Sequence, residues 1–417
     1  MPCNNIVWSR ITTPLPSVNN TSLTALRPCP VCDANNPDTR LLLKSFQFFT
    51  DSNVTDKQTD VITVQCKSCG ALYMNPVYTR AGFSILFAEA AASYGSSEGR
   101  PIEQAQWLAD KEDLSTGRSI IDLGCHHGEF LATLPDHLQR TGIDIDREII
   151  NTASRKNIDK NIQFYASAFT GELPLQPNSI ITMLHVLEHL PNPKATLVNL
   201  QQQSTPQTRL FIEVPLLEKG HTNDINGFLS VTHLTHFSRS SLRNCINNAG
   251  WKILHWDEQQ DYNGCRVIAM PDNDRTSMEQ PYNDSVEHEI KECQHYLAHW
   301  QQAVRNVVEK IDRLRDSQHC IIWGAGLHTE FLYQLTPLFN ANPAQQFILI
   351  DSDQQKQGKT WRGISIFSPE ALLNSDLGNT PIVISTYRNQ EAVAKQIIKL
   401  TGNNANIVRL YEHIRSY

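Results

Sequence analysis

The 417-residue chain has no apolar run approaching the roughly twenty residues that a membrane-spanning helix needs. Its N-terminus lacks the basic segment followed by an apolar core that marks a secretory signal. Positive charge is not in excess either, because 36 Lys and Arg stand against 43 Asp and Glu, for a net charge of −7. These absences argue against a membrane role and against general attraction to nucleic acid. We therefore expect a cytoplasmic protein whose partners are small molecules or other proteins.

The sequence does contain ten cysteines, and four of them form two CxxC pairs, Cys29 with Cys32 in RPCPVC and Cys66 with Cys69 in VQCKSCG. Cytosolic thiols are kept reduced, so these residues are better explained as metal ligands or buried thiols than as disulfides. Two CxxC turns supply the tetrahedral four-thiolate set of a structural zinc site. The segments LLLKSFQFF and VITVQ read as strands that bring the pairs together. The alternatives are free thiols or a redox pair, although the βαβ pattern of a thioredoxin-like site is absent.

A nucleotide-type turn follows in RSIIDLGCHHGEFLATL, where an apolar strand runs into a glycine-containing loop and then an apolar helix. Gly124 and Gly128 allow the backbone amides to approach a ligand closely, and Asp122 would hold the loop or the ligand. About twenty residues later, RTGIDIDREII ends a second strand at Asp144, whose carboxylate can accept hydrogen bonds from both ribose hydroxyls. The two segments predict a nucleotide site at the edge of an α/β sheet.

The motif DLGCHHG resembles the first motif of the class I S-adenosylmethionine-dependent methyltransferases, acid-x-Gly-x-x-x-Gly. LPLQPNSIITMLHVLEHLPNP looks like the fourth strand and following turn of that superfamily, with His185, Glu188 and His189 where HVLEH commonly occurs. The resemblance covers about 119–270 and implies S-adenosylmethionine as cofactor, with His185 on the cofactor side. The dinucleotide-binding GxGxxG is absent, which argues against a dehydrogenase.

Within this resemblance, Ala168 and Phe169 replace the acid that the third strand often carries, which implies adenine contacts through stacking or the backbone at Phe169. Tyr94, in SYGSS, resembles a YxSS element in which a tyrosine holds the developing enolate or orients a sugar. A second family tyrosine would fall on Ala91. The alternative for Tyr94 is a packing aromatic.

The whole-chain layout resembles the three-domain sugar C-methyltransferases, which act on nucleotide-linked 4-keto deoxysugars. After the CxxC pairs and the central unit, CIIWGAGLHTEFLYQL, FILIDSDQQKQGKTWRGISIFSPEAL and TPIVISTY alternate strand and helix like a smaller Rossmann-like sheet. The resemblance implies that Gly324, Gly326 and Asp351 lie near the nucleotide-sugar, although a GxG turn is also an ordinary strand-to-helix corner.

C-methylation next to a ketone needs a base that removes a carbon-bound proton and a group that stabilises the enolate. FLSVTHLTHFSRSSL resembles the EHLxYFS signature of that family, which implies His233 as the base, with His236 as a second catalytic candidate at the aromatic position. The family acid is replaced by Thr232, so Asp224 or Glu213 would have to supply a neighbouring carboxylate. The alternative is a structural role for both histidines at the start of a helix that Ser238, in FSRSSL, caps.

We predict an α/β protein with five segments: a zinc-binding domain at 1–80, a helical connector at 81–116, a methyltransferase domain at 117–272, a long amphipathic helix at 282–316 and a C-terminal α/β domain at 317–417. The long helix is expected to connect the two α/β domains, with a dimer contact as the alternative; the oligomeric state, monomer or homodimer, stays open. Three functions remain: sugar C-methylation, O- or N-methylation of another small molecule, and a non-catalytic binding protein.

Overall fold

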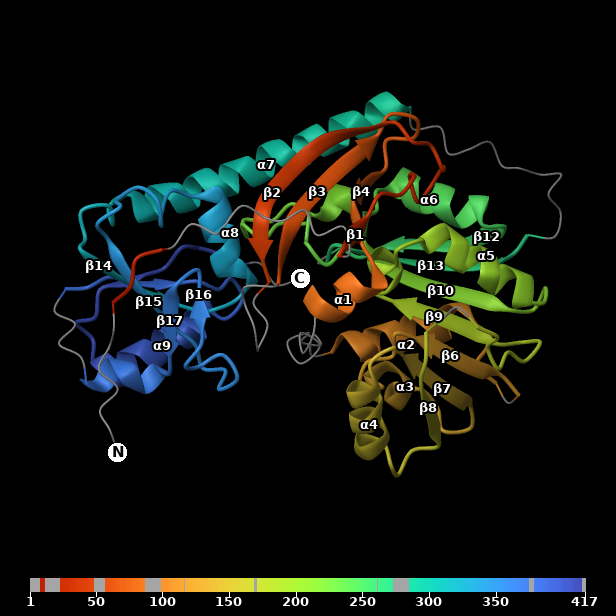
Figure 1. Ribbon diagram of the computed structural model, residues 1–417. Coiled ribbons are helices and arrows are strands. Elements are labelled where there is room, and N and C mark those ends of the chain that lie inside the picture. Colours follow the sequence, from red (N-terminus) through yellow and green to blue (C-terminus); the bar gives the residue numbers. More distant parts are fainter. Residues whose placement is uncertain are drawn as a thin grey trace.

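The computed structural model describes residues 8–11, 23–48, 57–86, 99–115, 117–168, 171–260, 262–272, 285–374 and 379–414. Its central and C-terminal sheets lie at opposite sides of the molecule (Figure 1). The N-terminal strands β2 (Pro37–Gln47) and β3 (Gln58–Cys66) and the helix α7 (Val286–Asp312) run between them across the top of that view. Three sheet-bearing parts are therefore held together along one side.

The central sheet has seven strands in the order β12-β13-β10-β9-β6-β7-β8. Strands β6 to β10 pair in parallel and β13 runs antiparallel to β10. The order reverses between β6 and β9, which is where open α/β sheets bind ligands beyond the carboxyl ends of their strands. The predicted α/β class with a central Rossmann-like sheet is confirmed. The strands are β6 (Ser119–Leu123), β7 (Gln139–Asp144), β8 (Ile162–Ala166), β9 (Ile180–Leu184), β10 (Arg209–Pro215), β12 (Trp251–Glu258) and β13 (Gly264–Pro271).

Helices cover both faces of this sheet, so β6 has all five residues buried, as a near-continuous apolar run predicts. The helix starts follow local capping chemistry: the Asp146 carboxylate accepts the first amides of α4, and Ser238 forms a capping box with Ser241 at α6. The FSRSSL segment is therefore a helix N-cap, as the alternative interpretation proposed. The elements are α2 (Arg100–Lys111), α3 (Glu129–Thr133), α4 (Arg147–Lys156), α5 (Pro193–Gln203), α6 (Arg239–Asn248), η3 (Leu187–His189) and η4 (Leu217–Lys219).

The N-terminal sheet has the order β11-β4-β3-β2, and its edge strand β11 comes from a distant part of the sequence. β11 (Thr235–His236) pairs antiparallel with β4 (Leu72–Met74), so the segment after His233 completes the sheet that carries the CxxC turns. A separate pair joins β1 (Thr24–Ala25) to β5 (Val77–Tyr78), and α1 spans Arg80–Leu86. The central part of the chain thus contributes an edge strand to the N-terminal sheet.

The C-terminal sheet has six strands in the order β16-β17-β15-β14-β18-β19, mostly parallel. Ser9 bridges to Phe347, so residues 8–11 lie on this sheet, although the sequence groups them with the zinc-binding segment. The elements are β14 (His319–Trp323), β15 (Gln346–Ile350), β16 (Thr360–Trp361), β17 (Ile364–Phe367), β18 (Ile382–Ile384), β19 (Ile407–Val408), α8 (Leu327–Leu335), α9 (Gln390–Thr401) and η5 (Pro369–Asn374).

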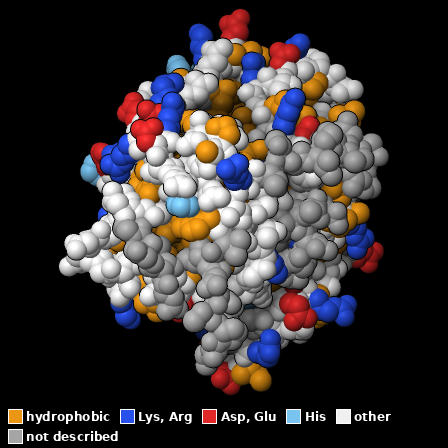
Figure 2. Space-filling model, turned by 60° about the vertical axis from the view of Figure 1, so that its left-hand side comes forward, with side chains coloured by type: hydrophobic (Ala, Val, Ile, Leu, Met, Phe, Trp, Pro, Cys, Tyr) orange, Lys and Arg blue, Asp and Glu red, His pale blue; other side chains and the backbone are white. Residues whose placement is uncertain are grey.

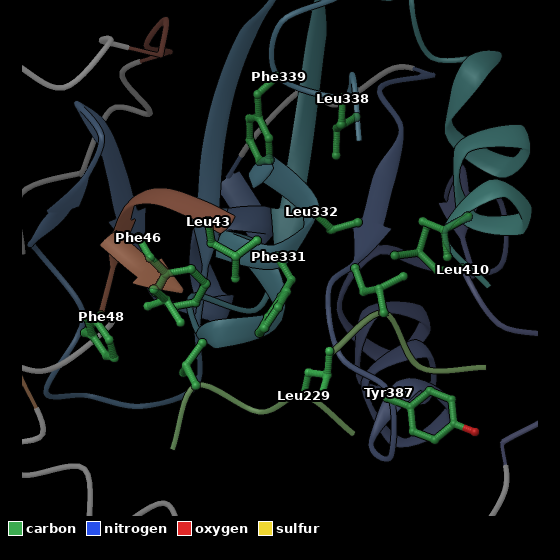
Figure 3. Close-up of a cluster of buried hydrophobic side chains, with 14 of the residues drawn as sticks. Leu43, Phe46, Phe48, Leu229, Phe331, Leu332, Leu338, Phe339, Tyr387 and Leu410 are labelled. Atoms are coloured by element: carbon green, nitrogen blue, oxygen red, sulfur yellow. The ribbon is translucent and has the colours of Figure 1, made fainter. Parts of the chain in front are cut away.

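One apolar cluster packs the N-terminal and C-terminal parts against each other (Figure 3). Leu43 and Phe46 from β2 lie beside Phe331 and Leu332 from α8, and the Phe46 and Phe331 rings meet edge to face with centroids 5.3 Å apart. Leu229, from the loop between β10 and β11, joins the same cluster. The loop that carries His233 is therefore braced by the C-terminal part.

The surface carries both signs of charge: on the face in Figure 2, the Lys and Arg side chains of the described residues alternate with Asp and Glu. This distribution agrees with the balanced composition. Among the described residues, no helix is both long enough and apolar enough to cross a bilayer.

Candidate active site

The glycine loop after β6 folds back onto β7. The amides of Gly124 and Cys125 donate to the Ile143 carbonyl at 2.7 and 3.2 Å, and both Gly124 and Gly128 have positive φ, near +74° and +79°. A Cβ on Gly124 would lie 2.4 Å from Val186, so the loop is packed too closely for any side chain there. The predicted turn residues therefore have the conformations and close approach that need glycine.

Two carboxylates flank this loop. Asp122 is buried and accepts a 2.6 Å hydrogen bond from the Thr182 hydroxyl. Asp144, at the end of β7, accepts from the amides of His126 at 3.1 Å and Asp146 at 3.0 Å while remaining partly exposed. The structure thus brings Asp122, Gly124, Gly128 and Asp144 to one edge of the sheet, at the point where the strand order reverses.

A second polar cluster follows β9. His185 has a positive φ near 58°, and its Nε2 lies 3.0 Å from Glu213 Oε1 and is hydrogen-bonded to the Tyr262 hydroxyl. Burial alone would lower the pKa of His185, but the hydrogen bond to Glu213 and the charges of Glu213 and Glu188 outweigh it and raise that pKa to about 9. His185, which the resemblance assigns to the cofactor, is therefore held between Glu213, Glu188 and Tyr262.

Glu213 is the centre of this cluster. Its side chain is fully buried, pairs with the Arg266 guanidinium and accepts from Gln104 Nε2 at 3.0 Å. Burial would raise the pKa of Glu213, but His185 and Arg266 lower it to about 2. A buried carboxylate with two cationic partners fixes the orientation of His185, so Glu213 is a positioning residue.

His233 lies beside His189, with ring centroids 4.8 Å apart. Burial and the neighbouring histidines lower its pKa well below the usual value. The acid next to it is Glu188, whose carboxylate lies in one cluster with ring nitrogens of His189 and His233, all within 4.8 Å of one another.

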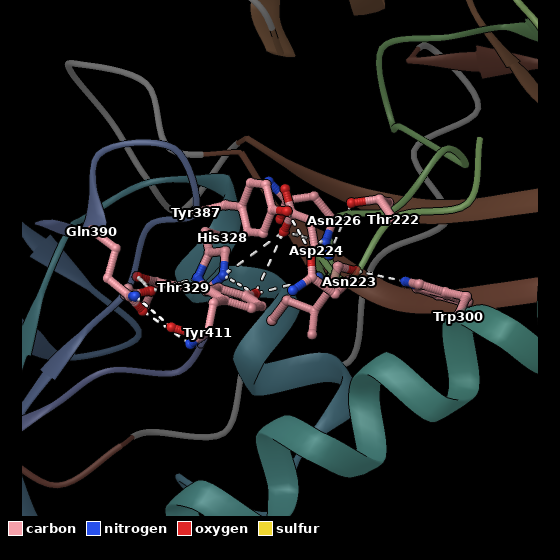
Figure 4. Close-up of polar contacts among 12 residues, drawn as sticks. Thr222, Asn223, Asp224, Asn226, Trp300, His328, Thr329, Tyr387, Gln390 and Tyr411 are labelled. Atoms are coloured by element: carbon pink, nitrogen blue, oxygen red, sulfur yellow. Dashed lines mark hydrogen bonds and ion pairs between the residues drawn. The ribbon is translucent and has the colours of Figure 1, made fainter. Parts of the chain in front are cut away.

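The two acids suggested from sequence as neighbours of His233 are engaged elsewhere. Glu213 holds His185, and Asp224 lies in a network with the C-terminal part (Figure 4). In that network the Tyr411 hydroxyl lies 3.4 Å from Asp224 and 2.6 Å from His328 Nε2. Burial raises the pKa of Asp224 to about 6.

A pocket of about 260 Å³ connects these groups. Its lining combines His185, His233 and Tyr262 with two arginines and with loop residues of the central and C-terminal parts: Arg100, Pro215, Gly220, Thr222, Asp224, Gly227, Phe228, Asn263 and Arg388. His236 is not among the lining residues. Pairing of β11 with β4 places it 1% exposed in the N-terminal sheet, against Phe228, and burial with the charge of Arg27 lowers its pKa to about 3.

Residues 100–256 match the family model described as a methyltransferase domain. This central unit is a methyltransferase domain. A curated relative, the ubiquinone biosynthesis O-methyltransferase of Aeromonas salmonicida, is 26% identical over 140 residues, which cover 30% of this chain and 58% of that protein.

Solved methyltransferase structures cover a similar share of the chain. An S-adenosylmethionine-dependent methyltransferase from Aquifex aeolicus is 19% identical, with a TM-score of 0.37, over 44% of this chain and 97% of its own. The magnesium protoporphyrin IX methyltransferase from Synechocystis with bound S-adenosylmethionine is 15% identical, with a TM-score of 0.34, over 45% of this chain and 93% of its own.

Outside the methyltransferase domain, the four predicted metal ligands meet at one point. Cys29 Sγ lies 3.7 Å from Cys69 Sγ, and Cys32 Sγ lies 3.6 Å from Cys66 Sγ. Zinc–sulfur bonds of about 2.3 Å in a tetrahedron require sulfur atoms about 3.8 Å apart. The thiol cluster therefore has the spacing that a four-thiolate zinc ion needs. Two other predicted site residues, Tyr94 and Phe169, lie outside the described residues.

Sequence reasoning missed Tyr262, Arg100, Arg266 and Arg388. Arg100, Tyr262 and Arg388 line the pocket from three distant segments, and Arg266 reaches Glu213 through the pairing of β13 with β10. A motif search has no signal for such residues.

Replacing Gly128 with Ala tests the loop of the methyltransferase domain. The new Cβ would lie 2.6 Å from Phe164 Cζ at a φ of +79°, so we expect a loss of roughly 1–3 kcal/mol in the free energy of unfolding. We also expect more than tenfold weaker binding of S-adenosylmethionine by calorimetry. Gly171→Ala is the control, since a Cβ there meets open space. Equal behaviour of the two variants would contradict the role given to the loop.

The buried Asp122 predicts a pH-dependent stability. Burial, opposed by the Thr182 hydrogen bond, raises its pKa to about 7, above the value of the unfolded chain. The folded state therefore favours the protonated form, and stability is lost as pH rises from about 4 to about 7. In cofactor-free protein, Asp122→Asn should gain roughly 2–4 kcal/mol relative to the wild type between pH 4 and pH 8, measured by urea unfolding. The exposed Asp159→Asn should show no such gain, and a pH-independent effect of Asp122→Asn would contradict the assignment.

Proposed function

We propose that the protein is an S-adenosylmethionine-dependent methyltransferase that methylates a carbon atom of a nucleotide-linked 4-keto deoxysugar. The observation that carries this proposal is the pocket in which His233, His185 and Tyr262 converge with two arginines beside the cofactor edge. A histidine can take a proton from carbon, and arginines suit the diphosphate of a nucleotide-sugar.

The cofactor would be held by the predicted loop. The tight turn at Gly124 and Gly128 would present backbone amides to the ligand, and the partly exposed Asp144 suits the ribose hydroxyls. When bound, S-adenosylmethionine supplies an electrophilic methyl group. Asp122, two residues before Gly124, ties the end of β6 to β9 through the Thr182 hydroxyl. The stacking role of Phe169 and the enolate contact of Tyr94 remain proposals from the family resemblance.

In this proposal His233 is the base that removes the proton next to the ketone. Tyr262 and His185, on the same pocket, can donate hydrogen bonds to the enolate oxygen. Glu213 acts by holding His185. His236 lies in β11, with its ring centroid 6.2 Å from that of His233 in the preceding loop, so we assign it a positioning role through the backbone of that strand.

The remaining parts of the chain support this site. The four cysteines would hold a structural zinc ion that fixes the turn before β4 and, through β4, the strand that follows His233. The C-terminal part would close the pocket with Arg388.

The second candidate is an O- or N-methyltransferase for another small molecule. It is favoured by Thr232, which replaces the acid of the sugar family, and by the curated relative named as an O-methyltransferase. C-methylation passes through loss of a carbon-bound proton, whereas O- and N-methylation do not.

The experiment uses methyl-labelled S-adenosylmethionine and a panel of nucleotide-linked 4-keto deoxysugars in heavy water. We expect a gain of one methyl group and deuterium at the carbon next to the ketone, both by mass spectrometry. Methylation of a hydroxyl or amine acceptor without carbon-bound deuterium would replace the proposal by the second candidate. Absence of any methylated product across both classes of acceptor would favour a non-catalytic binding protein.

A further inference from the structure

A second cluster of metal-ligand type lies apart from the four cysteines. Glu188 and His189 come from η3, and His233 comes from the loop before β11. One carboxylate oxygen and one ring nitrogen from each histidine lie within 4.8 Å of one another. Two imidazoles and one carboxylate form a ligand set that binds zinc, nickel or cobalt ions, and hard ions such as Mg²⁺ prefer oxygen atoms.

Glu188 is the buried anion of this cluster. Its side chain is 1% exposed, and within the described residues neither carboxylate oxygen has a hydrogen-bond partner. His185 Nδ1 lies 3.4 Å and His189 Nε2 3.9 Å from its Oε1. The raised pKa of His185 makes that ring one cationic neighbour of Glu188, but His185 is shared with Glu213. A buried carboxylate without hydrogen bonds is costly unless a cation neutralises it.

The two histidines are held in place for such an ion. His189 Nδ1 donates to the Thr232 carbonyl at 2.8 Å, and Nε2 is the ring nitrogen that lies 3.9 Å from Glu188 Oε1. This backbone contact is the usual outer-shell partner of a metal-binding imidazole. The amide of Leu234 donates to the Glu188 carbonyl at 2.8 Å, which locks the loop of His233 onto η3.

From this geometry we infer that Glu188, His189 and His233 bind a divalent transition-metal ion. Three protein ligands leave at least one coordination position open, as in sites that exchange water or bind a ligand oxygen. His233 also lines the substrate pocket, so the ion would sit at its wall. One consequence rests on the proposed function: an ion bound to His233 occupies the lone pair that would accept the substrate proton, so metal binding should inhibit methyl transfer.

The binding test uses the full-length protein with zinc loaded at the cysteines, titrated with Ni²⁺ in a calorimeter. Zinc release is followed with a chromogenic chelator, so that exchange at the cysteines is detected. We expect one equivalent of Ni²⁺ in the wild type and in His295→Gln, a control on the exposed side of α7. Glu188→Gln and His189→Gln should each bind at least tenfold more weakly.

His189 is partly exposed, so His189→Gln keeps the test valid if Glu188→Gln fails to fold. Unchanged affinity in His189→Gln, or binding accompanied by an equal release of zinc, would overturn the site.

Methyl transfer is then measured with increasing Ni²⁺. Inhibition in the wild type that weakens at least tenfold in His189→Gln supports the inhibitory role. Nickel binding without inhibition keeps the metal site but overturns its competition with the base. If the protein has no methyltransferase activity, the calorimetric result still decides the metal site alone.

Discussion

Replacing Cys69 with Ser is expected to remove zinc from the protein and to lower the free energy of unfolding by at least about 3 kcal/mol. The four sulfur atoms have tetrahedral spacing, and loss of one ligand forfeits much of the binding energy, which is about 10–16 kcal/mol in zinc-finger peptides. Zinc content by atomic absorption should fall from one ion per chain to near zero, and the urea midpoint should fall with it.

Cys320→Ser is the matched control for this prediction. Cys320 is a fully buried thiol in β14, in the C-terminal sheet, so its replacement costs packing but leaves the metal ligands in place. We expect full zinc content in that variant. A Cys69→Ser protein that keeps one zinc ion per chain would show that the cysteine cluster is not the metal site.

The second large effect is expected for His233→Asn. Loss of a general base lowers turnover by roughly 10²- to 10⁴-fold, and heavy-water exchange at the substrate carbon should fall by the same factor. Binding of S-adenosylmethionine should stay within about twofold of the wild type. The glycine loop follows β6 and Asp144 ends β7, whereas His233 stands in the loop before β11. Single-turnover kinetics and calorimetry measure the two quantities.

His299→Asn provides the comparison. His299 lies on α7, where its Nε2 meets the Thr222 carbonyl at 3.1 Å, close to the pocket but outside its lining. The His299→Asn variant should keep turnover within about threefold of the wild type. Full turnover in His233→Asn would assign the base to another residue.

Local motifs explain why much of the fold and the cofactor edge could be predicted. The glycine loop depends on residues within seven positions, and Gly124 and Gly128 supply two of its three positive φ angles, the third being at His126. The cysteine pairs carry their own turn geometry. Asp144 follows because it ends a short strand at a fixed distance after the loop.

The rest of the site depends on contacts between distant segments. Glu213 meets Arg266 only because β10 pairs with β13, and Glu188 meets His233 because the loop before β11 returns to η3. His236 was predicted at the reaction site because it stands at the aromatic position of the family signature, three residues after His233. Strand pairing with β4 places it in the N-terminal sheet. No local pattern encodes these registers.

The pairing of β4 with β11 has a consequence for synthesis on the ribosome. β4 and the cysteines leave the exit tunnel about 160 residues before β11. At about 5–20 residues per second, the nascent N-terminal sheet waits roughly 8 to 30 s with β4 as an unpaired edge. During that interval the metal turns can already close, so zinc supply during translation, rather than after release, would protect this edge from pairing with other nascent chains.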